Sequence, residues 1–143
     1  MAEPIAIRPV ATSADRKAFV DVQFRLNAQD PNWIPPLKDE ALGLITPGKN
    51  PFFEHAKAEL FIASRGGKPV GRISAHVDHL FQGMAGDQGG GSDMGNWGLF
   101  EAADAEVGAA LITHAEARLK ARGLTRILAP ISMSIWEEPG LLI

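Results

Sequence analysis

The chain has 143 residues, of which 45% are hydrophobic, and a formal net charge of −3. This length suffices for one domain with its own core, and the scattered basic residues exclude the clustered positive charge of a nucleic-acid binder. The absence of cysteine excludes disulfides and thiol nucleophiles, and no run approaches the roughly 20 apolar residues of an integral membrane segment.

The first third of the chain predicts one strand and two helices. Its N-terminal residues lack the basic and apolar regions of a secretory signal, so we expect a cytoplasmic protein. Residues 5–10 alternate weakly between apolar and polar side chains and predict a strand. Ser13 is the candidate N-cap of a helix that runs to about Leu26. The proline-rich residues 30–37 predict extended chain, and residues 38–45 predict a short helix.

A β-hairpin is predicted next. Residues 59–64 and 69–78 have the composition of strands, and the Gly66-Gly67 pair between them supplies the positive φ angles of a tight turn. Residues 82–96 follow, and six of these fifteen residues are glycine. We therefore expect residues 82–96 to form a flexible loop.

The segment from residue 97 to residue 130 predicts a strand–helix–strand unit. A strand over 97–101 leads through the acidic turn 102–106 into an amphipathic helix over 107–122, and a second strand follows over 124–130. Two strands joined by such a helix must be parallel. The predicted fold class is therefore α/β, with a mixed twisted sheet of about five strands. Antiparallel pairing fills its first half, one parallel βαβ unit completes it, and helices cover both faces.

Two candidate sites can be weighed from the residues alone. His76, Asp78 and His79 have metal-ligating side chains, but strand alternation places only the first two on one face. A half-exposed polar strand face is the preferred interpretation, so no metal site is predicted. The helix near residue 105 directs its unpaired N–H groups over the end of a strand, which makes this turn a candidate anion or cofactor site.

Five segments together resemble the GNAT-like acyl-CoA N-acyltransferases, a group that includes bacterial ceramide synthase-like proteins. They are Asp30–Leu37, Asn50–Ala56, Val70–Ala75, Phe100-Glu101 with the acidic helix start, and Glu138-x-Gly-Leu-Leu-Ile. Members of the family continue past this point, so the resemblance and the apolar end of the chain predict that residues 1–143 form one C-terminally truncated domain. The resemblance implies a GNAT-like sheet, with acyl-CoA as co-substrate where two parallel strands separate.

The chain departs from the family's phosphate-binding signature, [RQ]-x-x-G-x-[GA]. Aligning Gly108 with the last position of the signature places Ala103 at the Arg/Gln position and Glu106 at the first glycine. The acidic residues of this turn suit the N-terminus of a helix by about 0.3–1 kcal/mol each. The same charges would repel a pyrophosphate.

The resemblance implies a role for particular residues of this chain. Glu101 is the candidate catalytic residue, as a general base toward an attacking amine; the alternative is a solvated acid at the end of a strand. The candidate cofactor-binding residues are Phe100, Ala105, Glu106, Val107, Gly108, Ser132 and Ser134. For these the alternatives are an ordinary amphipathic helix that packs on the sheet, and serines that cap or turn the chain.

The leading functional prediction is an N-acyltransferase that transfers an acyl group from a CoA thioester to a small-molecule or lipid amine. The alternative is a non-catalytic acyl- or CoA-binding module, or an inactive fragment of a longer acyltransferase. Trp33, Phe52 and Phe53 are expected to pack the first helix against the sheet, or to line a channel for an acyl chain.

Overall fold

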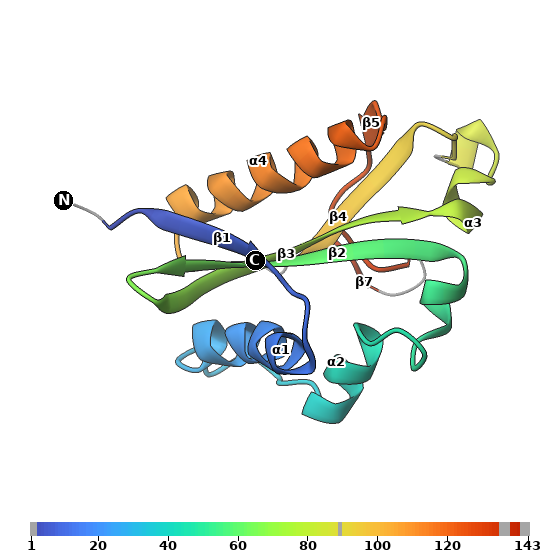
Figure 1. Cartoon of the computed structure of the whole chain (residues 1–143). Helices are drawn as coiled ribbons and strands as arrows, with labels where there is room; N and C mark the ends of the chain where they lie inside the picture. Colours follow the sequence, from blue (N-terminus) through green and yellow to red (C-terminus); the bar gives the residue numbers. More distant parts are fainter. Residues whose placement is uncertain (1–2, 89, 135–137, 141–143) are drawn as a thin grey trace.

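The computed structural model describes residues 3–88, 90–134 and 138–140. A twisted sheet forms the middle layer of the molecule, with helix α4 on one face and helices α1 and α2 on the other (Figure 1). This arrangement confirms the predicted α/β class with helices on both faces. Within the described ranges, no helix is both long enough and apolar enough to cross a bilayer.

The sheet has the order β1-β2-β3-β4-β5, with antiparallel neighbours from β1 to β4 and a parallel pair at β4–β5. The mixed sheet and its single parallel βαβ unit are therefore confirmed. The elements are β1 (Ile5–Pro9), α1 (Ser13–Asn27), α2 (Lys38–Leu44), the 3-10 helix η1 (Pro51–Glu54), β2 (Ala56–Arg65), β3 (Lys68–Asp78), α3 (His79–Gln82), the 3-10 helix η2 (Gly86–Gln88), β4 (Met94–Ala102), α4 (Ala105–Ala121), β5 (Arg126–Ile127), β6 (Ile131–Ser132) and β7 (Glu138–Pro139).

The β2–β3 hairpin forms as predicted. Arg65 pairs with Lys68, which leaves Gly66 and Gly67 as a two-residue turn, with φ values of 58° and 77°. Only residues without a β-carbon adopt two such angles in succession at little cost, so the glycine pair sets the register of both strands.

The N-cap of α1 differs from the prediction by one residue. Thr12, not Ser13, is the N-cap: its hydroxyl accepts from the backbone N–H of Asp15 at 3.1 Å, and the Asp15 carboxylate accepts from the N–H of Thr12 at 3.1 Å. This reciprocal pair is a capping box. Three residues after Ser13 stands Arg16, which cannot accept a hydrogen bond in return.

Each face of the sheet has its own core. On the α4 side, Val107, Leu111, Ala115 and Leu119 are at most 1% exposed and pack on Phe61 and Ile73, which confirms the predicted apolar stripe of this helix. On the α1 side, the core joins residues of α1, η1, β2 and β4, among them Phe19, Phe52, Ile62 and Leu99. The sheet is thus buried on both faces.

Two predicted boundaries around β4 and β5 are wrong. Strand β4 begins at Met94 and α3 ends at Gln82, so both ends of the expected loop 82–96 belong to regular elements. The side-chain amide of Gln82 donates to the carbonyl oxygens of Ser92 and Met94 at 3.1 and 2.9 Å and ties the two ends together. Flexibility between these ends stays a prediction. The strand expected over 124–130 is shortened to Arg126–Ile127, because beyond Leu128 the chain leaves the sheet.

Candidate functional site

A β-bulge interrupts β4 at its centre. Ser74 of β3 pairs with Gly98 and Arg72 pairs with Glu101, so Leu99 and Phe100 together lie opposite the single residue Ile73. Leu99 has a φ of 49°, which is uncommon for a residue other than glycine. Its backbone N–H is turned away from the ladder and donates to the hydroxyl of Ser132 at 3.2 Å.

The residues that follow β5 lie directly against this bulge. A β-carbon placed on Gly98 would approach the carbonyl oxygen of Ile131 to 2.0 Å, so only glycine permits the contact. Met133 also has a positive φ, of 69°, and its side chain is 1% exposed in the core on the α1 side. β4 and β5 are parallel, as predicted. However, the place where the resemblance expects these strands to separate is occupied beside Gly98 by Ile131 and Ser132.

Six buried polar side chains gather on the α1 side of the sheet. Four of them alternate along β3, and alternate residues of a strand share one face. The fifth, Asn96, belongs to β4 and lies directly opposite His76. The sixth, Ser132, accepts a hydrogen bond from the backbone N–H of Leu99. We call this set the polar band: Arg72, Ser74, His76, Asp78, Asn96 and Ser132.

His76 lies at the centre of the polar band and is fully buried. Burial lowers the pKa of its imidazole to about 4, against the opposing effects of Asp78 and of the Met133 backbone. Its Nδ1 lies 3.5 Å from the hydroxyl of Ser74, and the Phe52 ring meets the imidazole edge-on at 5.7 Å. The ring is therefore neutral at pH 7.

The half-exposed strand face predicted for His76 and Asp78 is wrong, because α1 and η1 cover this face of the sheet. Asp78 accepts from Nδ1 of His55 at 2.7 Å and from the backbone N–H of Leu80 at 3.0 Å, so it serves as the N-cap of α3. His79 points away from this pair and is exposed. Among the residues that the structure describes, no three His, Asp or Glu side chains gather as metal ligands would.

Glu101 lies at the end of β4, opposite Arg72 of the polar band. Its side chain is half-buried on the α1 side, and its carboxylate accepts from the side-chain amide of Asn27 at 3.3 Å. The Arg72 guanidinium lies 4.8 Å above the Phe19 ring and donates to the Phe19 carbonyl at 3.3 Å. The predicted catalytic acid is therefore held between α1 and β3, and is not a freely solvated strand-end residue.

The N-terminus of α4 is capped by the chain's own carboxylate. Asp104 accepts from the backbone N–H of Val107 at 2.9 Å and from Arg65 at 2.7 Å. Arg65 also reaches Glu106 at 3.3 Å. The hydrogen bond from Arg65, with that from Val107, holds the pKa of Asp104 below its usual value. An anionic ligand at this end would have to replace Asp104.

The predicted cofactor-binding residues do not converge on one point. Val107 and Gly108 are buried against the sheet, and a β-carbon on Gly108 would lie 3.2 Å from the ring of Phe100, so this glycine allows the ring to pack. Ala105 and Glu106 are exposed beside Asp104. Ser132 is at the bulge, and Ser134 is half-buried two residues further along.

Sequence reasoning missed Arg72, Ser74 and Asn96. A signal was present, because polar residues alternate with Ile73 and Ala75 along β3. Alternation alone, however, does not show which face a second layer of helices will cover.

No protein-family model matches the chain. It is 44% identical over 140 residues to the bacterial ceramide synthase of Caulobacter vibrioides, an alignment that covers 97% of this chain and 35% of that protein. It is 38% identical over 138 residues to protein YghO of Escherichia coli, covering 96% of this chain and 34% of that protein. The chain thus spans about a third of the length of these relatives.

Solved structures share its fold at low sequence identity. A tandem GNAT protein from the clavulanic acid biosynthesis pathway superposes with a TM-score of 0.63 at 14% identity, over 87% of this chain and 35% of that one. An aminoglycoside acetyltransferase from a soil metagenome, in complex with sisomicin, gives 0.58 at 14% identity, over 89% and 77%. An acetyltransferase of Clostridium acetobutylicum, solved with acetyl-CoA, gives 0.55 at 16% identity, over 90% and 82%. The chain therefore has the GNAT fold and is similar in sequence to a part of the bacterial ceramide synthase.

Proposed function

We propose that the chain is the part of an N-acyltransferase that brings an acyl-CoA thioester and an amine together at the bulge of β4. The observation that carries this proposal is the Leu99 N–H, which is buried, turned out of the β3–β4 ladder and held by an oxygen atom, that of Ser132. An N–H in that position can equally stabilise the oxyanion that forms when a thioester carbonyl is attacked. Ser132 would then release it.

The chemistry proposed is direct transfer. The amine nitrogen attacks the carbonyl carbon of the thioester, and Glu101, or a water that it holds, takes the proton lost by the nitrogen. The carbon–sulfur bond then breaks, and the CoA thiolate leaves and is protonated. Positioning the two reactants supplies most of the rate, and a general base contributes typically 10²–10⁴-fold.

Placement of CoA follows from the same geometry. We propose that the backbone of Ala105, Glu106, Val107 and Gly108, next to Phe100, lies beside the cofactor, with Ser132 and Ser134 along its pantetheine arm. The N-terminus of α4 fits a phosphate only after Asp104 turns away. Arg65 is then the cation that remains to pair with it.

The acceptor is proposed to be a small-molecule or lipid amine. An aminoglycoside acetyltransferase among the structural neighbours carries sisomicin, and the relative at 44% identity is named a ceramide synthase, a ceramide being the fatty amide of a long-chain amine. Of the aromatic residues expected to pack α1 or line an acyl channel, Phe52 and Phe53 are in the core on the α1 side and Trp33 meets the Phe24 ring at 5.3 Å. The cytoplasmic location stays a prediction from the sequence.

Release of free CoA thiol tests the proposal against the alternative of a binding module. We expect thiol release from an acyl-CoA only when an amine is added, and Glu101→Gln should reduce kcat at least about 100-fold, because the amide cannot accept the proton. Glu40→Gln, at an exposed acid of α2, is the matched control. If the chain is only a binding module, acyl-CoA should raise its melting temperature, and no thiol should be released under any condition.

A further inference from the structure

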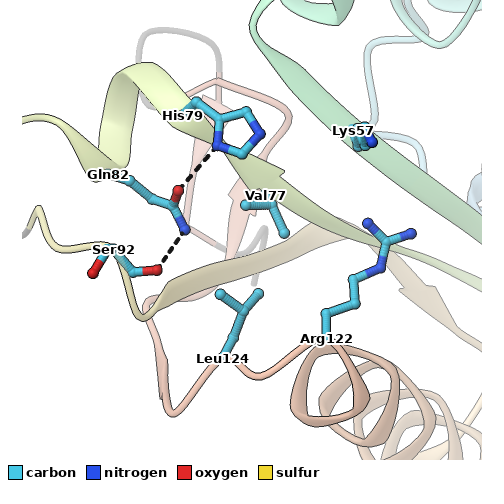
Figure 2. Close-up of a pocket in the computed structure, with 7 residues that line it drawn as sticks. All are labelled: Lys57, Val77, His79, Gln82, Ser92, Arg122 and Leu124. Carbon is cyan, nitrogen blue, oxygen red and sulfur yellow. Dashed lines mark hydrogen bonds between the residues drawn. The ribbon is translucent and has the colours of Figure 1, made fainter.

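A second recess lies at the opposite end of α4 from the proposed CoA site. The last turn of α4 reaches Glu59 of β2 through Arg118 and Arg122, and beyond that contact the sheet face is not covered by the helix. The uncovered corner is a cavity of about 420 Å³ between β2, β3, α3 and the chain that follows α4 (Figure 2). Its lining residues are Lys57, Val77, His79, Gln82, Ser92, Arg122 and Leu124.

The recess carries an excess of positive charge, although the whole chain is acidic. Arg118 and Arg122 share the carboxylate of Glu59, and Lys57 makes no ion pair within the described ranges. Burial raises the pKa of Glu59, but hydrogen bonds from the two arginines outweigh it and hold the pKa below its usual value. With Glu59 ionised, the three cations Lys57, Arg118 and Arg122 give this corner a net charge of +2.

Stabilisation of the α4 C-terminus explains only part of this charge. Arginines in the last turn or at the C-cap of a helix interact favourably with its dipole, and this accounts for Arg118 and Arg122. Lys57 belongs to β2, precedes Glu59 by two residues on the same strand face and is exposed. No element of the fold requires a cation at this position.

The other walls of the recess are held in place by contacts within the chain. Val77 and Leu124 form an apolar floor and are each 8% exposed. Nδ1 of His79 lies 3.1 Å from the side-chain oxygen of Gln82, whose amide donates to the backbone of Ser92. Figure 2 shows the His79 ring and the Arg122 guanidinium on opposite sides of the opening, with Val77 between them and Leu124 below. Charged and donor groups thus surround an apolar base.

We propose that this recess binds an organic phosphate that bears an apolar chain. A phosphate monoester carries nearly two negative charges at pH 7, which match the net charge of +2 that remains after Arg118 and Arg122 pair with Glu59. The phosphate would lie between Lys57 and Arg122, with its chain on Val77 and Leu124. The 17 residues of α4 span about 25 Å, so this site is separate from the N-terminus of the helix. The proposal does not depend on the acyltransfer chemistry.

Titration with butyl phosphate, inorganic phosphate and butylammonium tests the assignment, followed by calorimetry and by the methyl NMR signals of Val77 and Leu124. We expect butyl phosphate to bind saturably, to shift both methyl signals and to bind at least fivefold more tightly than inorganic phosphate; butylammonium should not bind. Lys57→Gln should weaken the binding of butyl phosphate at least fivefold and leave the rate of thiol release unchanged. Lys49→Gln, at an exposed lysine outside the recess, is the matched control. Binding unaffected by Lys57→Gln, or without shifts of the two methyl signals, would overturn the site.

Two sources of such a ligand are then distinguished with vesicles. Sedimentation with phosphatidylcholine vesicles that contain phosphatidic acid, and loss of that binding in Lys57→Gln, would assign the site to a lipid headgroup. Butyl phosphate binding without vesicle binding would assign it to a free phosphate ester. Absence of both would refute the proposal, even if the amine-dependent release of thiol is observed.

Discussion

The backbone N–H of Leu99 in β4 donates a hydrogen bond to the hydroxyl of Ser132 in β6, at 3.2 Å. Leu99 and Met133, on either side of this contact, are the two non-glycine residues with positive φ among the residues described. Strained backbone of this kind costs about 1–3 kcal/mol per residue and persists where the surrounding structure holds it. The Leu99–Ser132 contact therefore joins two strained turns at the point where an acyl oxygen is proposed to bind.

Removing the Ser132 hydroxyl should destabilise the fold, and the effect should be localised at the Leu99 N–H. Ser132→Ala leaves a buried donor without an acceptor, which costs about 1–3 kcal/mol of unfolding free energy. Urea denaturation measures this loss, and faster hydrogen exchange of the Leu99 amide localises it. Unchanged stability together with unchanged exchange at Leu99 would show that the hydrogen bond is not formed in solution.

The N-cap of α1 can be assigned by a pair of variants. Thr12→Ala removes the capping box and should lower the unfolding free energy by about 1 kcal/mol. Ser13→Ala, one residue later, should change it by less than about 0.5 kcal/mol, as at most exposed positions. Chemical denaturation of both variants gives the answer directly, and the reverse order of effects would move the cap to Ser13.

Burial of His76 predicts how stability depends on pH. Its folded-state pKa of about 4 lies below the unfolded value of 6.5, so the unfolded chain binds a proton first as the pH falls. The free energy of unfolding is therefore not lowered by this imidazole above pH 6.5, and it falls progressively as the pH drops from there toward 4. The difference between the two pKa values corresponds to a loss of roughly 3 kcal/mol in the free energy of unfolding.

Denaturation of His76→Asn between pH 4 and pH 8 tests that dependence. The variant should show a flatter pH profile than the parent chain, whatever its absolute stability. His79→Asn, which removes an exposed ring, should retain the parent slope. Equal slopes for the parent and His76→Asn would mean that this imidazole is not buried in its neutral form.

The carboxylate of Asp104 should weaken CoA binding if the phosphates of CoA occupy the N-terminus of α4. Asp104→Asn keeps a good N-cap, so stability should change little, while one negative charge is removed and Arg65 is released from its ion pair. We expect the Kd for CoA to fall by about 3–10-fold, the effect of one charge at several ångströms near a protein surface. Calorimetry measures it, with Asp39→Asn in α2 as the control, and an unchanged Kd would place the phosphates elsewhere.

Local signals in the sequence predicted the elements that depend on neighbouring residues. Gly66 and Gly67 set the hairpin, and the length of the segment that includes α4 required a parallel pair. The bulge at Leu99 was not visible, because a bulge adds one residue to a strand without altering the composition that marks it. The length of β5 was overestimated, because the apolar pattern continues through Leu128 into a segment that leaves the sheet.

The candidate site was less predictable than the fold. Glu101 is a candidate because of the family resemblance and its place at the end of a strand, but its contact with Asn27 joins residues 74 positions apart. The burial of His76 and Asp78 depends on α1 and η1 covering that face of the sheet, and no short-range pattern reports such packing. Asp104 was recognised as a favourable acid near a helix start, while its partner Arg65 comes from the distant β2–β3 hairpin.

The most direct test of acyl transfer at the β4 bulge is the rate of thiol release from an acyl-CoA, measured with and without an amine acceptor for the parent chain and for Glu101→Gln. We expect release that requires the amine and falls at least about 100-fold in the variant. An intact thioester with every amine tested, or a rate that Glu101→Gln leaves unchanged, would contradict it.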